Sequence, residues 1–153
     1  MVNTEVLGSR ITEARERMEL NKRGLSKLAV CSDTTVHHLE AGDKIPKSYT
    51  MANICWALKI SADWALGLTD VNRAPDKKPS VEMPGKRMWS CLSGLNRSCT
   101  EASRGSDISV ELFYQSWRNS TKAFSMQTVV KLARYYGVSV DYMLGLTDER
   151  RIP

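Results

Sequence analysis

The chain has 153 residues, with 22 lysines and arginines against 17 aspartates and glutamates, so its net charge is +5. That length accommodates one medium-sized domain or two small ones. The longest unbroken apolar run, Ile54 to Leu58, is far shorter than the ~20 residues that cross a bilayer. Glu5 and Arg10 interrupt the segment where a secretory signal would have its apolar core. We therefore expect a cytoplasmic protein without membrane segments.

Metal and catalytic patterns are missing from the sequence. The four cysteines form no CxxC pair, and neither histidine has a metal-ligand spacing from a cysteine. His37 and His38 are neighbours whose side chains point about 100° apart on a helix, so they do not chelate one ion together. No Ser/His/Asp group, phosphate-binding glycine loop or pair of catalytic carboxylates is recognisable. We expect reduced thiols, no metal, no cofactor and no enzymatic activity.

An internal repeat indicates how the chain is organised. Residues 61–70 read SADWALGLTD and residues 139–148 read SVDYMLGLTD, with seven of ten positions identical. Between the copies, residues 71–84 contain three prolines and no apolar periodicity, which is typical of a stiff, polar linker. We predict a first unit over residues 1–70 and a second over residues 85–153.

The first unit has the pattern of five short helices. Apolar residues recur at helical spacing from Leu7 to Met18, which predicts a helix over about residues 5–20. Gly42 and Pro46 indicate the end of the third helix. Strand-like alternation appears nowhere for more than a few residues, so the predicted fold class is all-α. The residues that begin the later helices are Asn21, Ser32, Ser48 and Ser61.

The second unit follows the same plan with a weaker start. A first helix is predicted over about residues 86–95, and Ser98 with Glu101 forms a capping box for the next. That second helix is weak, because Ala102, Gly105 and Ser106 stand where the first unit has Leu25, Leu28 and Ala29. The three remaining helices are expected to begin at Ser109, Ser125 and Ser139.

Residues 20–42, LNKRGLSKLAVCSDTTVHHLEAG, carry the pattern that indicates a function. They predict a short helix, a tight connection near Val30, and a helix with polar residues on one face. In a helix-turn-helix, the second helix enters the DNA major groove and its first residues reach base edges. The polar residues 32–35 with His38 fit that role, and Val36 with Leu39 would anchor the helix to the core.

This segment resembles the phage-repressor and Cro-like helix-turn-helix regulators, the XRE family. The resemblance covers residues 7–70, and more weakly residues 86–148, and it implies two tandem five-helix, lambda-repressor-like domains. Val30 stands where the family usually has a turn glycine, and Gly24 lies inside the second helix. The residues that carry the resemblance include Ile11, Arg15, Leu25, Ser32, Val36, Glu40, Gly42, Pro46, Leu58, Ile60, Ser61, Asp63, Leu66 and Gly67.

The resemblance implies a DNA-binding site in the first unit. Asp33, Thr34 and His38 match readers of base edges, although a carboxylate can only accept a hydrogen bond, as from a cytosine amino group. Lysines on the second helix and after the third match positions that contact phosphates, which give affinity and register. The predicted DNA-binding residues are Lys22, Ser32, Asp33, Thr34, Thr35, His38, Lys44 and Lys47.

In the second unit the corresponding helix would present Val110, Glu111 and Gln115. Residues 1–70 carry nine basic and nine acidic side chains, whereas residues 85–153 carry ten basic and six acidic ones. The electrostatic attraction to nucleic acid therefore belongs mostly to the half with the poorer reading helix. The second-unit DNA-binding candidates are Glu111, Gln115, Arg118 and Lys122.

Two geometries stay open. Both units can read DNA, so that one chain is a covalent pseudo-dimer with half-sites about one helical turn apart. Alternatively, the first unit reads DNA and the second forms a twofold homodimer on a palindromic operator. Phe113, Tyr114 and Trp117 are rich contact-making residues and favour the homodimer.

Two functions also stay open. The leading hypothesis is a sequence-specific regulator that binds double-stranded DNA, a repressor of phage or prokaryotic type. The alternative is a protein-interaction module on the same fold, such as an antitoxin or an inhibitor of a host nuclease. The zero net charge of the first unit and Asp33 favour the alternative, and the lysines of the reading face favour DNA.

Overall fold

The computed structural model describes residues 2–119 and 123–150, and within them it contains ten helices and no strand, so the all-α class is confirmed. No helix in this part of the chain is long and apolar enough to cross a membrane. The helices are α1 (Thr4–Arg17), α2 (Lys22–Ala29), α3 (Asp33–Ala41), α4 (Ser48–Leu58), α5 (Ala62–Ala65), α6 (Met83–Leu95), α7 (Cys99–Ser106), α8 (Val110–Arg118), α9 (Met126–Tyr136) and α10 (Val140–Leu144).

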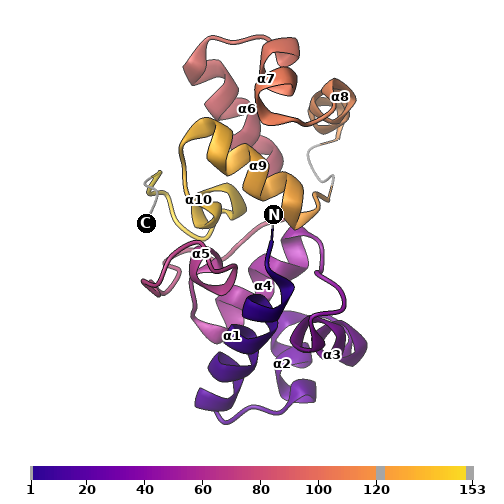
Figure 1. Ribbon diagram of the computed structural model, residues 1–153, viewed down its shortest axis with the longest axis vertical. Coiled ribbons are helices and arrows are strands. Elements are labelled where there is room, and N and C mark those ends of the chain that lie inside the picture. Colours follow the sequence, from indigo (N-terminus) through magenta and orange to yellow (C-terminus); the bar gives the residue numbers. More distant parts are fainter. Residues whose placement is uncertain (1, 120–122, 151–153) are drawn as a thin grey trace.

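The helices form two groups, with α1–α5 in the lower half of Figure 1 and α6–α10 in the upper half. In the lower half α3 packs against α1 and α2, and α2 also packs against α4. In the upper half α7 packs against α8 and α9, and α10 against α6 and α9. The groups meet where α10 contacts α4 and α5 and where α9 contacts α4.

Side-chain caps fix where several helices begin. Ser32 accepts a hydrogen bond from the backbone N–H of Thr35 at 3.1 Å, and Ser125 accepts one from Thr128 at 3.2 Å. Asn21, Ser98 and Ser139 cap α2, α7 and α10 in the same way. These caps satisfy donors that a helix leaves unpaired at its first turn, which explains why the capping residues located these helices. Ser109 precedes α8 without such a bond.

Some boundaries differ from the predictions. The first helix ends at Arg17 instead of near residue 20, because Glu19 takes the left-handed conformation with φ 56°. The helix α6 begins at Met83, inside the predicted linker, and Pro84 lies in its first turn, where no backbone donor is needed. The linker also packs against the second half, since the backbone N–H groups of residues 76 and 77 both donate to the Leu146 carbonyl at 3.1 Å.

The backbone conformation repeats along with the sequence. Four pairs of residues, 77 or 78 positions apart, take the left-handed conformation in both halves. The end of α3 breaks the pattern, because Gly42 is left-handed with φ 76° whereas Asn119, which follows α8, is extended with φ −139°. The matching pairs are Glu19 and Asn96, Val30 and Asp107, Lys59 and Gly137, and Gly67 and Gly145.

A contact between an arginine and an aromatic ring repeats as well. The Arg10 guanidinium lies 5.0 Å from the centre of the Trp64 ring, and the Arg87 guanidinium lies 3.9 Å from that of Tyr142. Each arginine also donates to the carbonyl and the carboxylate of the Thr-Asp pair that ends its repeat. Trp64 and Tyr142 are both buried, so each packs in the interior under its arginine.

Candidate nucleic-acid interface

The connection between α2 and α3 is a tight turn at Val30. Val30 has φ 54° and ψ 51°, and its side chain is directed to solvent, with 86% of the residue exposed. The Cys31 N–H donates to the Ser26 carbonyl at 3.0 Å, which closes the end of α2. A left-handed L-residue costs roughly 1–2 kcal/mol. The turn therefore has the left-handed conformation that glycine adopts most easily, although the residue in it is valine.

Asp33 takes part in this turn. The Ser26 hydroxyl, which is buried on α2, donates to Asp33 Oδ1 at the start of α3. It also lies 2.8 Å from the Arg23 carbonyl. One carboxylate oxygen of Asp33 is thus engaged in holding α2 and α3 together.

The helix α3 has one buried face and one polar face. Val36 and Leu39 are buried in the core. Thr34 and His37 are exposed, and His38 is half-buried. The anchoring residues and the polar residues therefore lie where the sequence pattern predicts them.

An open hollow of about 530 Å³ lies beside the start of α3. It is lined by hydroxyl groups, an imidazole and two lysines, chemistry that suits base edges and phosphates. Thr50 of α4 also lines it, although no local pattern indicated Thr50. Six of the eight predicted residues line this hollow: Ser32, Thr34, Thr35, His38, Lys44 and Lys47.

The lysines of the hollow are available to an anion. Lys44 and Lys47 are both exposed, and within the described ranges neither forms an ion pair. His38 Nδ1 lies 3.5 Å from Asp43 Oδ2. The hollow consequently has a positive rim on the side of the loop between α3 and α4.

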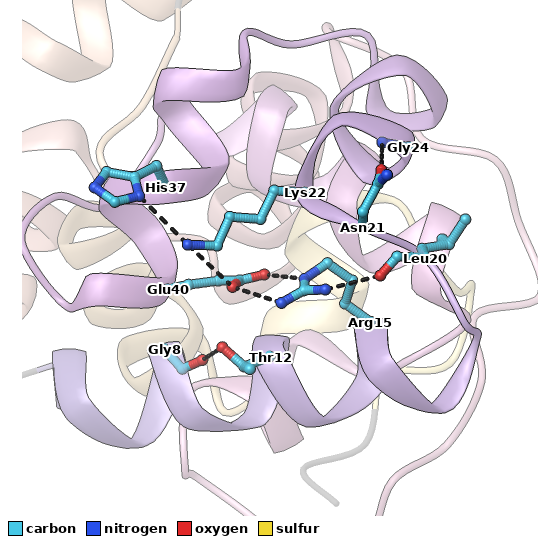
Figure 2. A network of polar contacts seen from close by, with 9 residues as sticks. All are labelled: Gly8, Thr12, Arg15, Leu20, Asn21, Lys22, Gly24, His37 and Glu40. Carbon is cyan, nitrogen blue, oxygen red and sulfur yellow. Dashed lines mark hydrogen bonds and ion pairs between the residues drawn. The ribbon is translucent and has the colours of Figure 1, made fainter.

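Lys22 lies outside this hollow, in a network that joins three helices (Figure 2). Its Nζ atom is 3.3 Å from His37 Nδ1 and 4.0 Å from Glu40 Oε2. Glu40 accepts two hydrogen bonds from Arg15, and Arg15 also donates to the Leu20 carbonyl at 2.7 Å. The network fastens α3 to α1 and α2, and it includes His37, which the sequence placed in no role.

The second half has a hollow at the matching place, with a volume of about 300 Å³. It is lined by Asp107, Ile108, Ser109, Glu111, Leu112, Gln115, Thr128 and Lys131. Seven of these residues stand 77 or 78 positions after residues of the first hollow. The repeat is therefore visible in the surface hollows, where each unit would bind a ligand, as well as in the backbone conformation.

The charges of the second hollow differ from those of the first. Lys131 Nζ lies 3.2 Å from Asp107 Oδ2, and Arg118 Nη1 lies 3.9 Å from Glu111 Oε1. Lys131, which lines the hollow, and Arg118, which does not, both have acidic partners, whereas Lys44 and Lys47 form no ion pair within the described residues. Lys122, the remaining predicted residue, lies outside the described residues.

Aromatic residues dominate the rest of α8. Phe113 is fully buried in the core of its own half, so the expectation that it contacts a partner is wrong. Tyr114 and Trp117 are exposed, and the Trp117 ring lies 5.0 Å from that of Trp89 in an edge-on arrangement. Two of the three proposed contact-making residues are thus at the surface.

Cysteine and histidine form no cluster in the residues that the structure describes. No group of three or more His, Cys, Asp or Glu residues there could hold a metal ion. All four cysteines are free, with Cys55 and Cys91 buried and the other two half-buried. Burial raises the pKa of the Cys55 thiol well above its ordinary value, so this group stays protonated.

Comparison with known protein families, curated proteins and solved structures finds no match to this chain. A functional assignment therefore depends on the residues themselves. The strongest observation is the polar hollow at the start of α3, whose two lysines form no ion pair with any residue that the structure describes.

Proposed function

We propose that the protein is a sequence-specific regulator that binds double-stranded DNA, with α3 as the helix that reads base edges. The observation that carries this proposal is the hollow at the start of α3, which collects hydroxyl groups, His38 and two exposed lysines. Val36 and Leu39 hold the opposite face of α3 in the core. A helix anchored in this way can enter a major groove as a rigid element.

The proposed fold is a tandem of two lambda-repressor-like domains of the XRE type. The order of the helices and the four repeated left-handed positions support this assignment. The proposed mode of action is a repressor in the cytoplasm, at the nucleoid, that occupies an operator. No cofactor or metal has a role in the proposal.

The predicted residues divide by what they contact. Lys44 and Lys47 would bind phosphates, because both are exposed and unpaired within the described part of the chain. Thr34 and His38 would contact base edges. Asp33 Oδ1 already accepts a hydrogen bond from Ser26 of α2, so Oδ2 is the oxygen with its full acceptor capacity for a cytosine amino group.

The test is selection of the full chain on a randomised duplex pool at near-physiological salt. An enriched motif is the expected result. Thr34→Ala and His38→Ala should each weaken binding by about 1–3 kcal/mol and relax the preference at one position. No enriched motif, or unchanged affinity in both variants, would remove α3 as the reader.

Two lysine substitutions distinguish a direct phosphate contact from the general effect of positive charge. Lys44→Ala should weaken binding to all sequences. It should also make the dependence of affinity on salt less steep, by the contribution of about one phosphate contact. Lys78→Ala is the matched control, since Lys78 is an exposed linker residue that lines neither hollow. Equal effects of the two substitutions would contradict a phosphate contact at Lys44.

The alternative function, a protein-interaction module such as an antitoxin or a nuclease inhibitor, is supported by one observation. Large apolar side chains are exposed on both helix-turn-helix segments, Leu28 and Val30 in the first and Tyr114 and Trp117 in the second. These groups stand at different positions of the two units, but exposed apolar side chains of this size favour a protein partner. Under this alternative the DNA selection yields no motif.

A further inference from the structure

The two halves cap each other's helices. Asp141 accepts hydrogen bonds from the Ser61 hydroxyl at 2.5 Å and from the Ala62 N–H at 2.6 Å, at the start of α5. Asp63 accepts from the N–H groups of Val140 and Asp141, both at 2.9 Å, at the start of α10. Both aspartates are buried. Each carboxyl group therefore serves a helix in the opposite half.

This exchange is reciprocal between matched positions, because Asp63 and Asp141 are equivalent residues of the repeat. A contact in which each partner gives and receives the same interaction is the property of a twofold interface. A second pair of bonds ties the halves beside it, with Ser48 N–H donating to the Phe124 carbonyl at 2.9 Å and Phe124 N–H donating to Ser48 Oγ at 3.2 Å. The chain thus contains an approximate twofold interface within itself.

The same relationship leaves the two candidate reading helices on one side of the molecule. In Figure 1, α3 and α8 both lie on the right-hand side, one in the lower half and one in the upper. Each has a hollow at its first turn, lined by equivalent positions. Twofold-related helix-turn-helix units address two half-sites spaced by one helical turn of DNA.

We propose that a single chain, as one copy, occupies two successive and unlike half-sites on one face of a duplex, with α3 in the first and α8 in the second. This inference rests on the proposed function. The half-sites differ because Thr34 and His38 of α3 are replaced by Glu111 and Gln115 of α8 at the matched positions. Glutamine pairs with adenine and glutamate accepts from cytosine, so the second half-site contains these bases.

A second copy is not needed, because the surfaces related by the approximate twofold axis already contact each other within one chain. A homodimer through α5 would bring two copies of Asp63 together, but Asp63 is buried against α10 of its own chain. The linker is fixed on the second half by two hydrogen bonds to Leu146, so the junction is part of the folded chain.

The experiment uses the full chain with a duplex enriched by selection. Native mass spectrometry gives the number of chains per duplex, and the expected result is one, on a motif whose halves are not inverted copies. Thr34→Ala should lose discrimination roughly 5- to 150-fold at one position of the first half only. Gln115→Ala should cause the same loss of discrimination at one position of the second half-site only.

The matched control for the second half is Gln127→Ala, since Gln127 is an exposed glutamine of α9 that lines neither hollow. It should leave both half-sites unchanged. Two chains on a palindromic motif, with Gln115→Ala as silent as the control, would overturn the single-chain inference and leave the proposed function standing. Failure to enrich any motif would overturn both.

Discussion

The two halves hold their equivalent helices, α3 and α8, by different means. In the first half Glu40, with a side chain only 5% exposed, binds the Arg15 guanidinium of α1. In the second half the residues 77 positions later are Leu92 and Trp117, and Trp117 packs on a neighbouring tryptophan while remaining 71% exposed. A buried, directional ion pair thus corresponds to an aromatic contact at the surface.

Both partners of the ion pair correspond to uncharged residues in the second half, in agreement with the high cost of a single unpaired charge. A guanidinium or carboxylate left alone in the interior costs roughly 3–5 kcal/mol, so replacement of one partner alone is unfavourable. The second half has neither charge at these positions. The bidentate contact fixes the orientation of α3 on α1, whereas an edge-on aromatic pair tolerates small rotations of α8.

The largest expected effect follows from removing one partner. Glu40→Ala leaves the Arg15 side chain, only 12% exposed, without its carboxylate and should destabilise the protein by about 3–5 kcal/mol. Urea denaturation followed by circular dichroism measures this loss. Glu13→Ala is the control, because the Glu13–Arg17 pair is exposed and should contribute less than about 1 kcal/mol.

Removal of both charges sharpens the same comparison. Arg15→Leu combined with Glu40→Leu should cost less than Glu40→Ala alone, since no buried charge remains unpaired. Urea denaturation again provides the measurement. A double variant less stable than the single one would mean that the ion pair stabilises the fold beyond what apolar packing supplies.

A feature that the halves share gives the next largest effect. Burial, followed by the neighbouring Asp63, raises the pKa of Asp141 to about 7, and burial also raises the pKa of Asp63. The folded state therefore binds a proton that the unfolded state releases near pH 4. The resulting stabilisation is complete below that pH and disappears as the pH rises through about 7.

Thermal melts should show this loss as a lower Tm at pH 8 than at pH 5.5. The difference should be on the order of 2 kcal/mol, or about 4–8 °C. Asp141→Asn should remove most of the dependence, because an amide does not ionise. A Tm that is equal at the two pH values in the unmodified chain would contradict a proton held by Asp141 in the folded state.

The aromatic contact of the second half should contribute less. Trp117→Ala should cost about 1 kcal/mol, because the ring is mostly exposed and loses only its edge-on contact with Trp89. Chemical denaturation is the measurement. A cost as large as that of Glu40→Ala would show that the surface contact and the buried ion pair hold their helices equally firmly.

The smallest effect is expected at the two turns. Val30→Gly should stabilise the protein by roughly 0.5–1 kcal/mol, because glycine removes the strain of a left-handed valine but is more flexible when unfolded. Asp107→Gly should stabilise less, since aspartate adopts this conformation more readily. A comparison of the two melting temperatures tests this order.

Local sequence patterns predicted where the helices lie, but they did not predict which distant residues the helices contact. Ser32 and Ser125 cap their own helices, so the bond is contained in the neighbouring sequence. Asp63 and Asp141 were visible as identical residues of the repeat, but nothing local distinguishes a carboxylate that caps its own helix from one that caps the other half. The start of α6 and the docking of the linker depend on such distant partners too.

The same division applies to the candidate interface. The polar positions of α3 and the loop lysines were predictable, because helical spacing alone places them beside one another. Lys22 was predicted as a DNA contact but lies against Glu40, and one oxygen of Asp33 is bound to Ser26. Both contacts depend on how α2 packs against α3, which a linear pattern does not contain.

The reciprocal aspartate caps have a consequence for how this protein changes. In a homodimer every substitution appears on both sides of the axis, so each side must tolerate the same residue. Here one chain supplies both sides, and a substitution appears once. The partner is also always present, because the linker and not the concentration of the protein sets how often the halves meet. One half is therefore free to keep a charged pair while the other acquires tryptophans, and dilution does not separate them.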